Sequence, residues 1–181
     1  MHTINWVDLI MVAIIGLGVY SARKSEMITE IVVLLGIVFS ACFSLHFYTR
    51  FGVVINKNIV LPPNTHEVLA YIIINVLVIG VTLLTKGGWL IILKINVKRE
   101  IDHWVCRGAS FIKSVFLCSI VLITLVISGR PAFESAAKKS FSYVLFRMPA
   151  FGAYSIFYNG FISPFFKGEP LNEKAFRSMQ S

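Results

Sequence analysis

The chain has 181 residues, of which 56% are hydrophobic and 14% are charged, and its mean hydropathy is +0.77. Soluble domains carry about 25% charged residues, and a short chain buries a smaller share of its surface than a long one, so a soluble globular protein and a disordered chain are both excluded. The composition indicates a polytopic membrane protein. Its net charge of +8 is explained by basic cytoplasmic loops facing anionic lipid rather than by binding to nucleic acid.

Four segments approach or reach the length of about 20 apolar residues that a spanning helix needs. They predict transmembrane helices over residues 4–20, 31–48, 68–85 and 109–128, and therefore an all-α membrane domain over residues 1–130. No segment alternates between polar and apolar residues, which argues against spanning strands. The first segment has no basic residue before it, so we expect a retained helix rather than a cleaved signal peptide.

The connections between these helices predict how the chain is oriented. Residues 21–26 form a short basic turn, residues 49–67 contain a proline turn, and residues 86–108 form the most basic connection, in which Trp89 to Leu93 is expected to lie at the membrane interface. With the N-terminus outside, and counting only residues within about 20 of the last span, seven Lys and Arg residues lie on the inner side and six on the outer side. Because basic residues collect in cytoplasmic loops, this count favours both termini outside.

The character of the sequence changes after Pro131. Residues 131–166 are rich in aromatic side chains and are expected to form an interfacial segment on the bilayer. We expect one amphipathic helix that Pro149 ends, and then a polar, mobile tail over residues 167–181. The predicted apolar face consists of Phe133, Ala137, Phe141, Val144, Leu145 and Met148, and the residues expected largely elsewhere are Glu134, Ser135, Lys138, Lys139 and Ser142.

Three ionisable residues in or near the predicted spans are candidate functional residues, because a charge at this depth is costly. Glu30 and Lys113 each begin a helix that enters from the same side, which suggests an ion pair. Asp8 enters from the opposite side, where Arg50 and Arg130 are its nearest partners by depth. The competing interpretation is that Lys113 extends to the interface and that both carboxylates are solvated near helix N-termini.

Small residues recur every four positions on two of the predicted helices. Such faces allow helix backbones to approach closely in lipid, so we interpret them as packing surfaces. Asn75 lies in the middle of the third helix and is expected to bond across helices in the same structural role. The two faces consist of Gly36, Ser40 and Ser44, and of Cys106, Ser110, Ser114 and Cys118.

The sequence contains no recognisable catalytic or cofactor motif. The four histidines are scattered, and His103 with Cys106 has a ligand-like spacing that two residues cannot turn into a zinc site. The three cysteines form no CxxC pair. We therefore expect a protein that is not an enzyme and that has no catalytic residues, no metal and no cofactor.

The order of three motifs resembles the colicin V production protein family of bacterial inner-membrane proteins. Asn5-Trp6-Val7-Asp8 is similar to the family's opening signature, and Glu30 to Gly36 is similar to its Glu-x-x-x-Leu-x-Gly run. Ile101-Asp102 through Lys113 is similar to a segment with regularly spaced glycines, where this chain has Cys106, Ser110 and Ser114. The glycine usual in the first basic turn is absent. The likeness covers roughly residues 4–130.

The resemblance implies a four-helix inner-membrane protein needed for toxin production or export and associated with envelope homeostasis. It carries over no catalytic residues, so Asp8, Glu30 and Lys113 stand only at motif positions. Our first hypothesis is a non-enzymatic membrane factor, with the lipid bilayer and further copies of the chain as its expected partners and no nucleic acid. The alternative is a small oligomeric channel or transporter subunit in which these three residues line a path.

Overall fold

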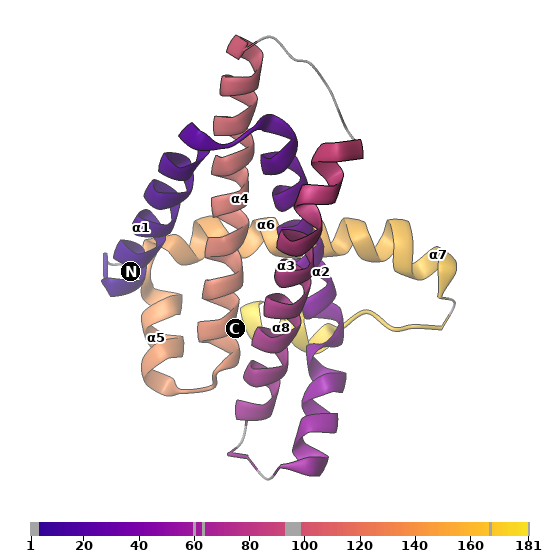
Figure 1. Ribbon diagram of the computed structural model, residues 1–181. Helices are drawn as coiled ribbons and strands as arrows, with labels where there is room; N and C mark the ends of the chain where they lie inside the picture. Colours follow the sequence, from indigo (N-terminus) through magenta and orange to yellow (C-terminus); the bar gives the residue numbers. More distant parts are fainter. Residues whose placement is uncertain (1–3, 60, 63, 93–98, 167, 181) are drawn as a thin grey trace.

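A computed structural model describes residues 4–59, 61, 62, 64–92, 99–166 and 168–180, and all of the long elements in this part of the chain are helices (Figure 1). Their bounds are α1 (Trp6–Ser21), the 3-10 turn η1 (Ala22–Lys24), α2 (Met27–Asn58), α3 (Thr65–Ile92), α4 (Arg99–Ile127), α5 (Pro131–Lys139), α6 (Phe141–Phe157), the π-helical turn η2 (Tyr158–Ile162), α7 (Ser163–Phe165) and α8 (Glu173–Gln180).

Helices α1 to α4 form the bundle, and three of them are long and apolar enough to cross a membrane. Helix α1 is a shorter apolar helix of 16 residues, or about 24 Å, against a hydrocarbon core of about 30 Å. The expected all-α membrane protein is therefore confirmed, with three long helices and a shorter fourth. Its α2 is 32 residues long, so it extends well beyond the predicted span.

The small-residue faces lie where the helices meet. Helices α2 and α3 make the most extensive contact in the bundle. A side chain at Gly36 would place its Cβ 2.3 Å from Thr82 Cγ2, so this crossing requires glycine. On the other side of the bundle, Ser110 Oγ donates to the Gly18 carbonyl at 2.7 Å, which holds α4 against α1. The predicted packing role of these faces agrees with both contacts.

The connection after α3 differs from the prediction. Helix α3 continues through Ile92, and α4 begins at Arg99, so Trp89 to Ile92 are the last turn of a long helix and not part of the connection, while their place at the membrane interface stays a prediction. Leu93 and residues 94–98 lie outside the described residues. The helix continues through Lys86-Gly87-Gly88, where no proline interrupts it.

The C-terminal region forms two helices where one was predicted. Ser140 ends α5 in an extended conformation and caps α6, since its side chain accepts the Tyr143 N–H. Pro149 lies inside α6 and does not end it. The expectation of one helix ending at Pro149 is therefore wrong. Helix α6 is held on both sides of the proline, by α4 before it, where Ser119 Oγ donates to the Phe146 carbonyl, and by α2 after it, where Tyr154 contacts His46. These contacts explain why the helix tolerates the lost hydrogen bond.

Helix α6 crosses the bundle roughly at right angles to the long helices (Figure 1). Four members of its predicted apolar face, Phe141, Val144, Leu145 and Met148, are exposed, whereas Ser142 is buried against the bundle. The exposed apolar side chains thus face away from the bundle, as an interfacial helix requires. Ser142 was expected on the polar side, and it is buried because its backbone N–H and its hydroxyl both donate to Asp8 Oδ1.

The expected mobile tail is packed against the bundle. Helix α8 lies below α6, beside the lower ends of the long helices (Figure 1). Ala175 is 1% exposed and belongs to the same hydrophobic core as α2, α4 and α6. The prediction of a mobile tail is therefore wrong for this segment. Helix α6 crosses the long helices near the middle of their length, the N-terminus of α1 lies close to it, and α5 and α8 lie below it (Figure 1).

Candidate functional site

Asp8 connects the N-terminus of α1 to the N-terminus of α6. Asn5 and Asp8 form a capping box at the start of α1, in which Asn5 N–H donates to Asp8 Oδ2 at 2.9 Å. The other oxygen, Oδ1, accepts both the backbone N–H and the hydroxyl of Ser142, at 2.7 and 2.6 Å. One carboxylate therefore caps α1 and fixes the first turn of α6, where negative charge is favourable.

The same corner explains the opening Asn-Trp-x-Asp motif in physical terms. Asn5 Nδ2 also donates to the Ala136 carbonyl at 2.8 Å, so the asparagine holds α5 while the aspartate holds α6. Trp6 packs edge-on against Phe133 with 6.2 Å between ring centroids. The partners predicted for Asp8 were wrong, because Arg50 binds Glu169 and Arg130 lies over the Phe133 ring.

Glu30 and Lys113 form an ion pair between α2 and α4. Lys113 Nζ lies 2.5 Å from Glu30 Oε2, and the two side chains are 11% and 5% exposed. This contact confirms the suggested ion pair. One turn earlier, the Met27 N–H donates to Asp102 Oδ1 at 2.9 Å, so α4 also caps the N-terminus of α2. The motif carboxylates Glu30 and Asp102 thus hold the same two helices together.

Asn75 lies between α2 and α3. Its Oδ1 accepts the Ser40 hydroxyl at 2.7 Å, and its amide donates to the Tyr71 carbonyl of its own helix at 2.9 Å. Both residues are buried. On α4, the Ser114 hydroxyl donates to the Ser110 carbonyl of the same helix. Of these contacts, the Ser40–Asn75 bond joins two helices and has the character of an interhelical hydrogen bond that stabilises a membrane fold, whereas the other two satisfy polar groups within their own helix.

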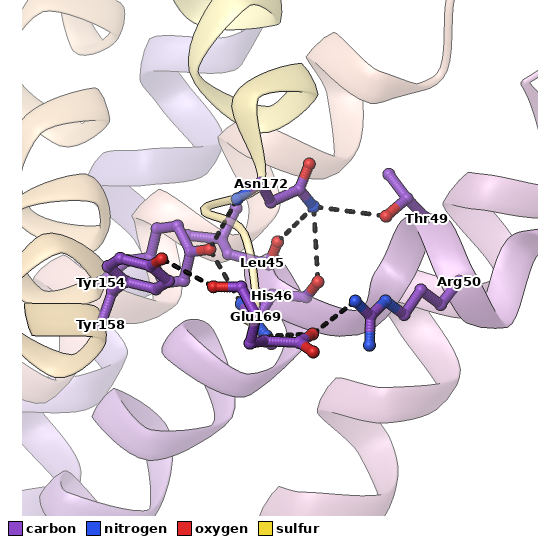
Figure 2. Close-up of polar contacts among 8 residues, drawn as sticks. All are labelled: Leu45, His46, Thr49, Arg50, Tyr154, Tyr158, Glu169 and Asn172. Carbon is purple, nitrogen blue, oxygen red and sulfur yellow. Dashed lines mark hydrogen bonds and ion pairs between the residues drawn. The ribbon is translucent and has the colours of Figure 1, made fainter. Parts of the chain in front are cut away.

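A fourth polar cluster, which the sequence analysis did not find, holds the C-terminal segment (Figure 2). His46 of α2 lies between Tyr154 of α6, with 3.0 Å from Nδ1 to the phenol oxygen, and Glu169, with 3.2 Å from Nε2 to Oε1. Arg50 lies 2.5 Å from the same Glu169 oxygen. Asn172 donates through its amide to the Leu45 carbonyl at 2.8 Å. We call Glu169 to Ala175 the C-terminal strap.

The backbone of the strap also takes part in this cluster. Asn172 N–H donates to the Tyr154 oxygen at 3.1 Å, and the same oxygen lies 3.0 Å from His46 Nδ1. Burial raises the pKa of the Tyr154 phenol, so the phenol stays protonated. At the other end of the strap, Lys174 pairs with the buried Glu67 at the start of α3.

The sequence carried partial signals for this strap. Asn172 Oδ1 accepts the Ala175 N–H, which is the pattern of a helix N-cap, and Asn followed by Glu-Lys-Ala is typical of a helix start. Its partners could not be found in this way, because His46 lies more than 120 residues earlier in the chain.

The candidate ionisable residues do not meet in one cavity. Asp8 lies at the α1–α6 corner, and Lys113 lies on α4 next to Ser114, which faces Gly18. Asp8 and Gly18 are ten residues apart on α1, or about 15 Å. Within the described ranges no group of three or more His, Cys, Asp or Glu side chains could hold a metal ion. Cys106 instead donates to the Ser25 carbonyl, and His103 contacts Arg107.

Comparison of the sequence with models of protein families identifies the family of this chain. The model described as Colicin V production protein matches residues 7–150. The chain belongs to the colicin V production protein family. Comparison with curated proteins and with solved structures found no match.

The matched region has a structural meaning. It contains Asp8, the Glu30–Lys113 pair and Asn75, and it ends within α6. Glu169 and Asn172 lie beyond it, so the C-terminal strap is packed onto the family's core from outside the matched residues.

Proposed function

We propose that this member of the colicin V production protein family is a non-enzymatic protein of the bacterial inner membrane that supports toxin production or export and envelope homeostasis. The observation that carries the proposal is that the costly polar groups of the long helices bind one another. The Glu30–Lys113 pair joins α2 to α4, and the Ser40–Asn75 bond joins α2 to α3. Their side chains serve the helix packing of a membrane scaffold.

The alternative, a small oligomeric channel or transporter subunit, would use Asp8, Glu30 and Lys113 to line a path. The geometry favours it less, because Asp8 is committed to helix capping about 15 Å from the level of the ion pair. Within one copy of the chain, these groups therefore support two separate helix contacts.

A complementation experiment tests the proposal. In a colicin V-producing strain that lacks the protein, the wild-type chain should restore toxin secretion and tolerance of bile-type detergents. The double variant Glu30→Gln, Lys113→Met should also restore toxin secretion and detergent tolerance, provided that it is folded. It removes both charges together and therefore leaves no unpaired charge. Lys57→Gln, at an exposed position of α2, is the matched control.

A flux experiment separates the two candidates. Purified protein in liposomes should carry no ion or solute flux above that of empty vesicles, and Asp8→Asn should change nothing. Reproducible flux that Glu30→Gln abolishes, in a variant that is still folded, would overturn the scaffold proposal and establish the channel.

A further inference from the structure

An apolar groove of about 890 Å³ runs along α2 from Met27 to Cys42. At 1.5 Å per residue this stretch is about 22 Å long. One edge is α3, through Thr82 and Thr85, and α6 closes the lower end. Phe157 of α6 packs edge-on against Phe39 of α2 there, with 5.6 Å between ring centroids.

The lining of this groove offers almost nothing to a polar ligand. Its members other than the two threonines are Met, Ile, Val, Leu, Gly, Phe, Cys and Ala residues. The hydroxyl of Thr82 donates to the Val78 carbonyl at 2.9 Å, and that of Thr85 donates to the Val81 carbonyl at 3.0 Å. Both hydroxyls are thus satisfied by their own helix, and an occupant of the groove must be apolar along its length.

The open end of the groove is basic. Met27 directly follows the basic turn that contains Arg23, and Lys86 directly follows the lining residue Thr85. Arg23, Lys86 and Arg107 are exposed at this end, against one exposed carboxylate among the described side chains there, that of Glu26. The Asp102 carboxylate accepts the Met27 N–H, and the Glu30 carboxylate is paired with Lys113.

We propose that this groove binds one acyl chain of an anionic phospholipid, whose phosphate group lies near Lys86 and Arg23. A leaflet's hydrocarbon layer is about 15 Å deep, so a groove of this length accepts a chain that enters from the leaflet at the basic end. The basic rim supplies the attraction for an anionic headgroup, and the apolar wall excludes the solutes that a channel would carry. The proposal does not depend on a role in toxin production.

Native mass spectrometry of the full chain, released from detergent, tests this site. The probes are phosphatidylglycerol and phosphatidylcholine with the same acyl chains, and inorganic phosphate alone. The wild type should retain phosphatidylglycerol more strongly than phosphatidylcholine and should not bind phosphate. Arg23→Glu with Lys86→Glu should weaken retention of phosphatidylglycerol by roughly 5–30-fold, to the level of phosphatidylcholine or below. Lys57→Glu, on the last turn of α2, is the charge control.

Filling the groove tests the acyl chain separately. Leu35 lines the groove and is 62% exposed, so Leu35→Trp occupies the space without disturbing the core and should abolish retention of both lipids. Ala153→Leu provides a second, milder block from the α6 side. The control is Leu77→Trp on an exposed face of α3 outside the groove. Equal retention of both lipids by the wild type, or unchanged retention in a folded Leu35→Trp variant, would overturn the proposal, as would displacement of the lipid by phosphate.

Discussion

At the scale of single residues, the informative feature is where each buried charge finds its partner. A charged side chain inside a membrane is costly unless it is paired, and the cost falls on whichever partner is left behind. Glu30 and Lys113 satisfy this condition across α2 and α4. The expected depth of each residue in the membrane was enough to predict this pair, because both residues lie near the start of helices that enter from the same side.

Removing one member of the pair should destabilise the protein more than removing both. Lys113→Met leaves the Glu30 carboxylate buried and unpaired, and a loss of about 3–5 kcal/mol in the free energy of unfolding is expected. The double variant Glu30→Gln, Lys113→Met should recover most of this loss. The measurement is the thermal unfolding midpoint in detergent, where about 1 kcal/mol corresponds to roughly 2–4 °C for a chain of this size. Equal destabilisation in the single and double variants would contradict the pairing.

Asp8 should act as a double cap rather than as a charge. Asp8→Ala removes the acceptors for the Asn5 N–H and for Ser142, so we expect a loss of about 1–2 kcal/mol for each helix end. Asp8→Asn keeps one carbonyl oxygen and should lose less. Unfolding midpoints of both variants check this, with Glu26→Ala as the exposed control. If Asp8→Asn were as damaging as Asp8→Ala, the negative charge and not the capping would be the important property.

At the scale of elements, the length of the apolar segments predicted the long helices, the spacing of small residues predicted packing faces, and tertiary contacts decided the rest. The four-residue spacing of Gly36, Ser40 and Ser44 indicated a packing face, and the structure shows that its partner is α3. The break at Ser140 and the continuation of α6 through Pro149 were missed. Both depend on partners distant in sequence, namely Asp8 at Ser142 and the α2 and α4 surfaces against α6.

The C-terminal strap is the element whose attachment can be tested most directly. Asn172→Ala removes the bond to the Leu45 carbonyl and the cap of α8, and Glu169→Ala removes the partner of His46 and Arg50. Each lost hydrogen bond weakens docking by about 1 kcal/mol, so the population of the released strap should rise roughly fivefold or more.

Limited trypsin cleavage after Lys174 measures this release. It should be several-fold faster in either variant than in the wild type, while the long helices remain intact by circular dichroism. Asn159→Ala, an exposed change in η2, should leave the rate unchanged. A rate that stays at the wild-type value in both strap variants would show that these polar contacts do not hold the segment.

At the scale of the whole molecule, composition was sufficient for the class of protein, and family motifs were sufficient for membership. Composition could not show that a helix crosses the bundle at right angles or that the last residues return to it, since both follow from contacts between distant segments. The fold adds one constraint on topology. Helix α6 crosses the middle of the long helices beside the start of α1, α5 and α8 lie on one side of it, and η1 lies on the other side (Figure 1).

Orientation in the membrane should follow from the charges on these two sides. Counted within about 20 residues of the long helices, seven Lys and Arg residues lie on the side of η1 and of residues 86–108 and six lie on the other side, and we expect the more basic side to be cytoplasmic. A reporter active only outside the cytoplasm should work when fused after Ser181 or inserted between residues 59 and 64, and should fail between residues 93 and 98.

Because the margin is one residue, neutralising Arg23 and Lys24 reverses the balance to five against six, and part of the population should then invert. Neutralising Lys57 widens the margin and should leave every reporter as in the wild type. A cytoplasmic signal after Ser181 in the unaltered chain would contradict this orientation.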